Sequence, residues 1–285
     1  MPTAADKHLH GELVCEMGPA GSGKSEFAVQ APQPHAILCV DKPVIAALPD
    51  SFPGYNPALS FGKFYPPPAK DLTNDKEKPS RNIFDEIIKD IEALKSALKD
   101  GNGLDMAGES WPLPRTIIVE GMDFIRDHCV NWVLNTQGKY HMDEFLTADG
   151  RPNVFLGWGL VAAKMDELFQ NLSFLPAVRP VNVIVTIGLD EETKRIRDDR
   201  GRESTIKTGN FDPAFGGKMS IEAPRKFRDC WLTEKAAGKY FIHTAQTDKT
   251  TKFRGLRAGR FGLKAVEDVT IDLAKPINHW NRLFG

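Results

Sequence analysis

An eight-residue motif close to the N-terminus constrains the fold of this chain more than any other feature. Residues 18–25 read GPAGSGKS and match the pattern G-x-x-x-x-G-K-[ST]. The apolar run 12–17 precedes the motif, and the helix-compatible run 24–30 follows it. The sequence therefore predicts a buried strand, a glycine-rich turn and a helix in direct succession. That order is typical of a phosphate-binding loop.

Each part of the motif has a physical role in such a loop. Glycines let the backbone curl so that its amide groups point inward at phosphate oxygens, and the dipole of the following helix points the same way. Lys24 is expected to reach the β- and γ-phosphates of ATP, and the Ser25 hydroxyl to bind Mg²⁺. The alternative is a glycine turn with an incidental lysine. The predicted nucleotide-binding residues are Gly18, Pro19, Ala20, Gly21, Ser22, Gly23, Lys24 and Ser25.

Two acids near the end of one apolar run are candidates for holding the metal. The run 116–120 (TIIVE) predicts a strand that ends in Glu120, which is expected to hold Mg²⁺ through water. Asp123 lies three residues further on and is expected to share this role or to orient water. The alternative, that Glu120 merely ends a buried strand, stays open.

Two further polar residues sit at strand ends. Asp41 follows the apolar run 36–40, where an acid can polarise the attacking water, or it simply marks a junction between a strand and a turn. Thr186 lies near the end of the strand expected over 181–187 and is a candidate sensor of the γ-phosphate. Strands also use threonine for packing, so the residue type alone does not decide this.

Strands and helices alternate over the first 190 residues, which predicts an α/β fold with a mainly parallel twisted sheet flanked by helices. Helices are expected over about 83–98, 123–134 and 157–172. An antiparallel hairpin is expected from two strand-like stretches that flank the turn 234–238. The expected organisation is a tail over 1–10, a core over 11–264 and a C-terminal extension over 265–285. Within the core, 49–80 is a Pro-rich insertion with little regular structure.

Composition excludes several classes of protein. The chain has 285 residues, of which 41% are hydrophobic, so it can bury a sizeable core and is not intrinsically disordered. A net charge of −1 excludes a basic coat for nucleic acid, so any basic site must be local. The four cysteines are far apart and form no zinc or disulfide pattern. Without an apolar membrane span or signal peptide, a cytoplasmic protein with no membrane partner is expected.

The order of these segments resembles a known family. GPAGSGKS, TIIVEGMDFI, NVIVTIGLDEET, FDPAFGGKM and KYFIHTAQTDKTTKFRG follow one another as in the RecA-like core. More specifically, they resemble the phage-encoded P-loop ATPases of that class, which include the RecA-like single-strand annealing proteins. The resemblance covers about residues 11–260, and only the P-loop is a sharp motif. A phage origin would place the protein in the host cytoplasm.

The resemblance implies an assembly as well as a fold. RecA-like proteins bind ATP at the edge of a subunit interface and form rings or filaments, so a homo-oligomer is expected. A neighbouring subunit inserts a basic residue toward the γ-phosphate, and Lys252 and Arg254 stand at the matching place. If they lie on a strand, a spacing of two puts both on one face. The alternative is a solvated basic edge.

The resemblance also implies loops that contact DNA after the third and fourth core strands, and single-stranded DNA is the expected partner. The stretch 194–207 carries six basic and three acidic residues, a balance of +3, which favours phosphate contacts. Phe211 or Phe215 is a candidate for stacking on a base. A solvated basic loop is the alternative. The predicted DNA-binding residues are Lys194, Arg195, Arg197, Arg200, Arg202 and Lys207.

One departure from the family bears on activity. RecA recombinases carry a glutamate just after the second strand as the water-activating base, whereas here Asp41 is followed by Lys42 and Pro43. If Asp41 does not substitute, hydrolysis is slow or DNA-stimulated, and ATP acts mainly as an assembly switch.

Three functions are consistent with the sequence. The first is an ATP- and Mg²⁺-dependent ATPase that acts on DNA in phage-type recombination, annealing or replication. The second is a small-molecule P-loop kinase, with the arginines of 195–202 as a lid. The third is a non-catalytic protein whose assembly is gated by nucleotide.

Overall fold

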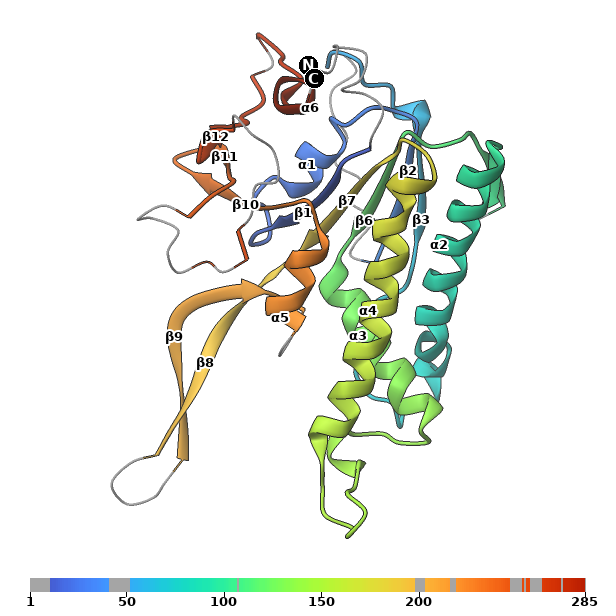
Figure 1. Ribbon diagram of the computed structural model, residues 1–285, viewed down its shortest axis with the longest axis vertical. Coiled ribbons are helices and arrows are strands. Elements are labelled where there is room, and N and C mark those ends of the chain that lie inside the picture. The colour runs from blue at the N-terminus through green and yellow to red at the C-terminus, as the bar shows by residue number, and fades with distance from the viewer. Residues whose placement is uncertain are drawn as a thin grey trace.

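An eight-stranded sheet forms the centre of the computed structural model (Figure 1). The structure describes residues 11–40, 52–106, 108–197, 203–215, 219–246, 253, 255–256, 263–272 and 274–284. The strand order across the sheet is β12-β11-β10-β1-β7-β6-β2-β3. All neighbours from β10 to β3 pair in parallel, while β11 and β12 pair antiparallel at one edge. The predicted α/β class, parallel sheet and C-terminal antiparallel hairpin are confirmed.

The strands are short and mostly buried, as expected for a parallel sheet covered on both faces. Those of the sheet are β1 (Leu13–Met17), β2 (His35–Cys39), β3 (Ser60–Phe64), β6 (Thr116–Glu120), β7 (Asn182–Ile187), β10 (Asp229–Ala236), β11 (Lys239–His243) and β12 (Val266–Asp268). Two separate antiparallel pairs are β4 (Leu104–Met106) with β5 (Glu109–Trp111), and β8 (Leu189–Arg197) with β9 (Glu203–Pro213).

Three long helices cover one face of the sheet. Their buried side chains form one core with alternate residues of the strands. They are α2 (Ile83–Asp100), α3 (Met122–Thr136) and α4 (Val154–Val178). Each was predicted, and α4 extends beyond its predicted bounds at both ends. No helix in the described ranges is both long and apolar enough to cross a membrane.

The opposite face is covered by two short helices, α1 (Lys24–Ala28) and α6 (His279–Phe284). The sequence predicts no helix at the C-terminus, yet α6 packs there. The rings of Trp280 and Phe284 stack with centroids 4.2 Å apart, and Phe284 stacks on Trp231 of β10 at 5.1 Å. The aromatic residues of 280–284 therefore complete the core beside the P-loop helix. Short α5 (Met219–Glu222) precedes β10.

Two segments expected to be irregular contain strands. Within 49–80, β3 pairs in parallel with β2 and extends the sheet, while 3-10 turns over Pro57–Leu59 and Asp75–Asn82 flank it. Tyr65 donates a hydrogen bond to Asp90 of α2 at 2.5 Å, and Lys63 forms an ion pair with the same carboxylate at 2.6 Å. Contacts with α2, which are distant in sequence, therefore hold this segment against the core.

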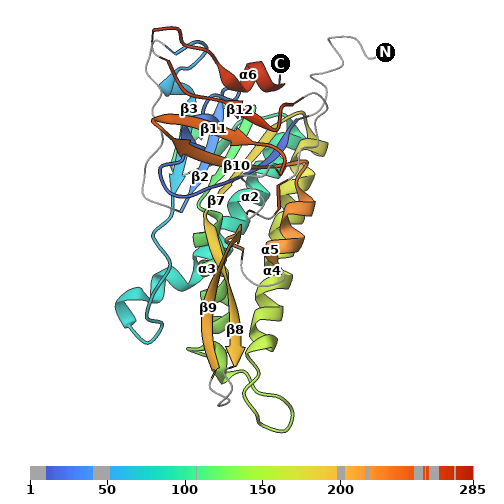
Figure 2. The same ribbon diagram turned by 90° about the vertical axis from the view of Figure 1, so that its left-hand side faces the viewer.

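The second segment is the polar stretch after β7. It was expected to be a flexible loop, but β8 and β9 form a long antiparallel hairpin with one register shift. Figures 1 and 2 show this hairpin projecting beyond the sheet, in the same general direction as the far ends of α3 and α4. Its many polar residues and its β-branched residues, such as Thr193, Ile196 and Ile206, suit a solvated two-stranded ribbon.

Candidate functional site

The P-loop joins β1 to α1 at the carboxyl end of the central parallel strands. The Gly18 amide donates to the Ile187 carbonyl at 3.1 Å, which ties the start of the loop to the end of β7. Gly23 precedes α1 with φ 89° and ψ 12°, a conformation that favours glycine. A cavity of about 610 Å³ lies over the loop and is lined by every residue of the motif. The predicted strand, turn and helix are therefore present.

Gly18 and Ser22 are fixed against β10. A Cβ added at Gly18 would lie 2.4 Å from the Thr233 hydroxyl, so only glycine fits there. The Ser22 and Thr233 hydroxyls lie 2.7 Å apart, and that of Thr233 donates to the Met17 carbonyl at 3.1 Å. Ser22 therefore donates to Thr233. The loop is held in shape by buried contacts with the neighbouring strand.

The Lys24 ammonium lies over the loop. It donates to the carbonyl oxygens of Gly18 at 2.8 Å and Pro19 at 2.9 Å. Both acceptors belong to the first half of the motif, so the ammonium spans the loop from the helix side. A bound polyphosphate would offer stronger, charged acceptors for the same donor group.

Ser25 and Glu120 meet across the cavity. The Ser25 hydroxyl donates a short hydrogen bond to the Glu120 carboxylate at the end of β6. Glu120 lines the same cavity as the P-loop. The two residues predicted to bind Mg²⁺ thus lie side by side, although β7 separates their strands.

Thr186 lies between them on β7. Its hydroxyl accepts from the Gly121 amide at 3.2 Å, so its own proton can go to another acceptor. The side chain is buried and lines the cavity with Glu120. This placement allows the predicted γ-phosphate contact and fixes the turn that follows Glu120.

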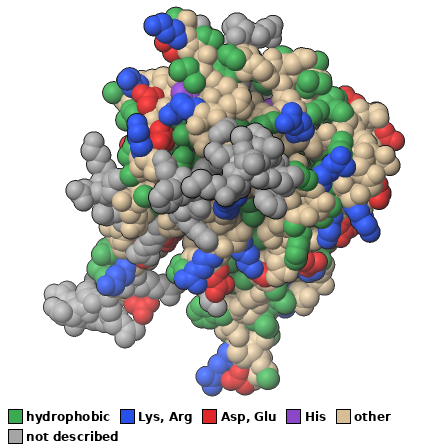
Figure 3. Space-filling model, turned by 45° about the horizontal axis from the view of Figure 1, so that its top comes forward, with side chains coloured by type: hydrophobic (Ala, Val, Ile, Leu, Met, Phe, Trp, Pro, Cys, Tyr) green, Lys and Arg blue, Asp and Glu red, His purple; other side chains and the backbone are tan. Residues whose placement is uncertain are grey.

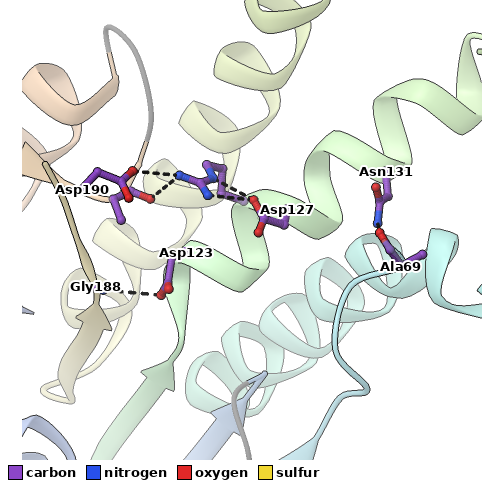
Figure 4. A network of polar contacts seen from close by, with 8 residues as sticks. Ala69, Asp123, Asp127, Asn131, Gly188 and Asp190 are labelled. Carbon is purple, nitrogen blue, oxygen red and sulfur yellow. Dashed lines mark hydrogen bonds and ion pairs between the residues drawn. The ribbon is translucent and has the colours of Figure 1, made fainter. Parts of the chain in front are cut away.

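Asp123 lies in the first turn of α3 and lines the cavity, and Figure 4 shows its side chain directed toward Gly188. Its carboxylate accepts from the Gly188 amide at 3.5 Å. Burial raises the pKa of Asp123, while its hydrogen bonds and the charges of Arg126 and Lys24 act in the opposite direction. The result is a carboxyl group that holds its proton more tightly than an ordinary aspartate.

Arg126, one turn further along α3, anchors the base of the β8–β9 hairpin. It donates to the Ala214 carbonyl at 2.8 Å and forms ion pairs with Asp127 at 2.8 Å and Asp190 at 3.4 Å (Figure 4). Asp190 belongs to β8, and Ala214 follows β9. The helix that carries Asp123 is therefore bonded to both ends of the hairpin.

Glu16 is a buried acid near the site that the sequence analysis did not single out. It lies in β1, level with Thr186 of β7, and is fully buried. Neither carboxylate oxygen has a hydrogen-bond partner among the described residues. Burial raises its pKa well above the usual range; Lys24 opposes this and Glu120 adds to it. The detectable signal was an ionisable residue inside the apolar run before the motif.

The donor set suits Mg²⁺. A serine hydroxyl and one carboxylate offer hard oxygen ligands, and magnesium is commonly held by one or two carboxylates together with substrate phosphates and water. Within the described part of the chain, no group of three or more His, Cys, Asp or Glu residues could hold a metal ion alone. The Ser25–Glu120 pair therefore fits a cation that arrives with a polyphosphate.

Four of the six predicted DNA-contacting residues, Lys194, Arg195, Arg197 and Lys207, lie on the two strands of the β8–β9 hairpin. Lys194 lies on β8, and Lys207 of β9 forms an ion pair with Glu191 at 2.8 Å. Arg200, Arg202, Asp41, Lys252 and Arg254 lie outside the described residues, as do the side chains of Arg195 and Arg197. On the face drawn in Figure 3, basic and acidic side chains are interspersed.

One aromatic prediction is wrong. Phe215 is buried, with its ring edge-on to that of Phe169 of α4 at 5.0 Å, so it belongs to the core and cannot stack on a base. Phe211 is only partly buried, and its ring stacks on that of Phe253. Both are phenylalanines in a polar stretch, and only tertiary packing distinguishes them.

Comparisons with known proteins find similarity in structure but not in sequence. No protein-family model matches the sequence, and no curated protein matches it. Among solved structures, the crystal structure of the RadB recombinase is similar, with a TM-score of 0.40 and 10% sequence identity. The match covers 93% of this chain and 89% of that one. A likeness at this level does not indicate a function for this chain.

Proposed function

We propose that this chain is a RecA-like P-loop ATPase that binds ATP with Mg²⁺ in the cavity over residues 18–25. The observation that carries the proposal is the contact between Ser25 and Glu120 beside the Lys24 ammonium. The motif supplies backbone amides that donate hydrogen bonds to phosphates, together with the positively charged Lys24 ammonium. Strand β6 supplies the carboxylate for the metal. These groups come from distant parts of the chain and converge on one cavity.

The residues have distinct roles in this proposal. Backbone amides of the P-loop and Lys24 bind the phosphates, while Ser25 and Glu120 hold Mg²⁺, which neutralises phosphate charge. We assign the orientation of water to Asp123, because it lines the cavity while the Ser25 hydroxyl is bonded to Glu120. Asp41 keeps its predicted role as an alternative base. Thr186 contacts the γ-phosphate.

DNA is the proposed partner, in recombination, annealing or replication of the phage type. The support is the stretch 194–207, whose charge balance is +3 and which belongs to the β8–β9 hairpin. The ends of that hairpin are bonded through Arg126 to the helix that carries Asp123. This connection gives a physical route by which nucleotide and DNA can affect each other. A ring or filament, with Lys252 or Arg254 reaching a neighbour's nucleotide, remains part of the proposal, as does a preference for single strands.

The kinase alternative needs an arginine lid that closes over the phosphates. The part of the arginine run that the structure describes lies on β8 in the projecting hairpin, which extends away from the sheet (Figure 1). In the assembly alternative the chain binds ATP but does not hydrolyse it. A measurement of the ATP hydrolysis rate therefore distinguishes that alternative from the ATPase.

The deciding experiment measures ATP hydrolysis with Mg²⁺, with and without a single-stranded oligonucleotide. It compares the wild type, Lys24→Ala, and the control Lys89→Ala on the exposed side of α2. We expect a rate that requires Lys24, is unchanged in the control, and rises with DNA.

Other results have defined meanings. A Lys24-dependent rate that ignores DNA contradicts the DNA role and favours a small phosphoryl acceptor. ATP binding without hydrolysis favours the assembly role. A rate that persists in Lys24→Ala contradicts the site itself.

A further inference from the structure

A second cavity, of about 450 Å³, lies on the β10 side of the P-loop. It shares Leu189 and four consecutive loop residues, 19–22, with the cavity that contains Glu120 and Thr186. The two cavities therefore meet around the first half of the motif. A ligand whose phosphates occupy the first cavity can extend into the second without leaving the loop.

The walls of the second cavity are mainly apolar and aromatic. Phe211 of β9 and Phe253 stack with ring centroids 5.2 Å apart and 21° between the ring planes. Their backbones form an isolated bridge, which brings the two segments together. Leu189 and Leu232 add aliphatic surface. Such a surface suits a flat aromatic group, because stacking on aromatic side chains is favourable for any base.

Polar groups stand beside this apolar wall. Glu234 and Lys235 at the end of β10 line the same cavity. The Glu234 carboxylate receives a hydrogen bond from His243 at 2.8 Å, and the Lys235 ammonium lies 5.0 Å from the centre of the Tyr240 ring. One acceptor and one donor group beside a stacking surface match the mixed polar edge of a nucleobase.

We propose that the second cavity holds the base of the nucleoside triphosphate, stacked against the Phe211–Phe253 pair. This rests on the proposed function, because it places the rest of the ligand whose phosphates occupy the P-loop. It also changes the role predicted for Phe211 from a contact with DNA to a contact with the nucleotide. The shared P-loop lining favours the nucleotide, since a DNA base would not need to adjoin residues 19–22.

The test separates the base from the phosphates. Calorimetric titrations compare Mg·ATP with Mg·tripolyphosphate, which carries no base, on the wild type and Phe211→Ala. Phe155→Ala is the matched control, because Phe155 is 82% exposed near the start of α4. We expect Phe211→Ala to weaken ATP binding about tenfold or more and to leave tripolyphosphate binding unchanged. The control changes neither.

Two further variants guard against a folding defect. Phe253→Leu keeps apolar bulk but removes the second aromatic face, and we expect it to weaken ATP selectively as well. Phe211→Trp places a reporter in the cavity, and we expect ATP, but not tripolyphosphate, to quench the added fluorescence.

The overturning results are specific. If the Phe211→Ala substitution weakens the binding of ATP and of tripolyphosphate equally, the aromatic pair only supports the loop. If it weakens neither, the base binds elsewhere. If Phe211→Ala loses oligonucleotide binding while its ATP binding is unchanged, Phe211 contacts DNA, as the sequence analysis predicted. If the wild type binds ATP weakly but tripolyphosphate well, the base proposal fails alone. If it binds neither, the proposed function fails too.

Discussion

The Ser25 hydroxyl donates a hydrogen bond to the carboxylate of Glu120, 95 residues further along the chain. Ser25 lies in the first turn of α1, and Glu120 ends β6. The sheet brings them together because β1, β7 and β6 are neighbours in parallel register and end at the same edge. This contact is the structural basis for assigning a magnesium–polyphosphate site.

The first prediction concerns the metal. Ser25→Ala removes a hydroxyl ligand of the ion, and Glu120→Gln removes the negative charge that holds the ion, so each lowers Mg²⁺-dependent ATP hydrolysis by at least about tenfold. Because both act on one ion, the double variant is little worse than either single one. Steady-state rates across a magnesium titration check this, and chelation with EDTA abolishes the wild-type rate. If the losses of rate in the two single variants add in the double variant, the two residues do not act on the same ion.

The second prediction concerns Glu16. Its raised pKa means that the folded protein keeps a proton that the unfolded chain loses above about pH 4.3. Stability is therefore lost as pH rises from that value toward the folded pKa, by about 1.4 kcal/mol per pH unit. Glu16→Gln mimics the protonated acid and removes this loss.

Denaturant titrations between pH 5 and pH 8 measure this effect. The stability gained by Glu16→Gln over the wild type should grow with pH. Glu92→Gln, on the exposed side of α2, serves as the control and should show no such trend. A Glu16→Gln variant that is equally destabilised at all pH values would mean that Glu16 is charged in the fold.

The third prediction concerns the pH dependence of turnover. Asp123 must be ionised to orient water by accepting its proton, and burial raises its pKa. The hydrolysis rate should therefore fall with decreasing pH at a value above the usual range of an aspartate, near 3.9. Asp123→Asn should lower the rate and remove this limb of the pH profile. An Asn variant with the wild-type profile would assign the limb to another group, with Asp41 the next candidate.

The fourth prediction concerns DNA. Lys207 is paired with Glu191 at 2.8 Å, so phosphate contacts by Lys207 must compete with that carboxylate. Glu191→Gln should therefore tighten binding to single-stranded DNA. Lys207→Ala should lower the magnitude of the salt slope by about one. Binding measured by fluorescence anisotropy at several salt concentrations checks both, with Lys89→Ala as the control. Identical salt slopes in all variants would exclude Lys207 from the phosphate contacts.

Periodicity and motif chemistry predict the central fold well. The segment TIIVE forms β6 at the predicted bounds, and the P-loop has its expected strand and helix. Local patterns suffice there because a parallel strand buried on both faces is continuously apolar. Glu120 and Ser25 were predicted to hold one ion because a P-loop needs an acid at the end of an apolar strand, and the structure brings them together because parallel strands end at the same edge.

The elements that were missed depend on distant contacts. Strand β3 is short and lies among prolines, and it forms because β2 has an open edge for it. Helix α6 has only six residues and is held by Phe27, Trp231 and the aromatic rings of 280–284. Phe215 and Glu16 likewise take their roles from packing across the sheet. No periodicity in the local sequence carries such information.

The most direct test of the central claim is a calorimetric titration of Mg·ATP into the wild type and Lys24→Ala. The P-loop account predicts one site per chain in the wild type, with binding lost or weakened by about a hundredfold in the variant, since the ammonium that spans the loop is removed. It also predicts that binding of ATP to the wild type weakens when magnesium is withheld. Equal affinity of the two proteins for Mg·ATP would contradict the account.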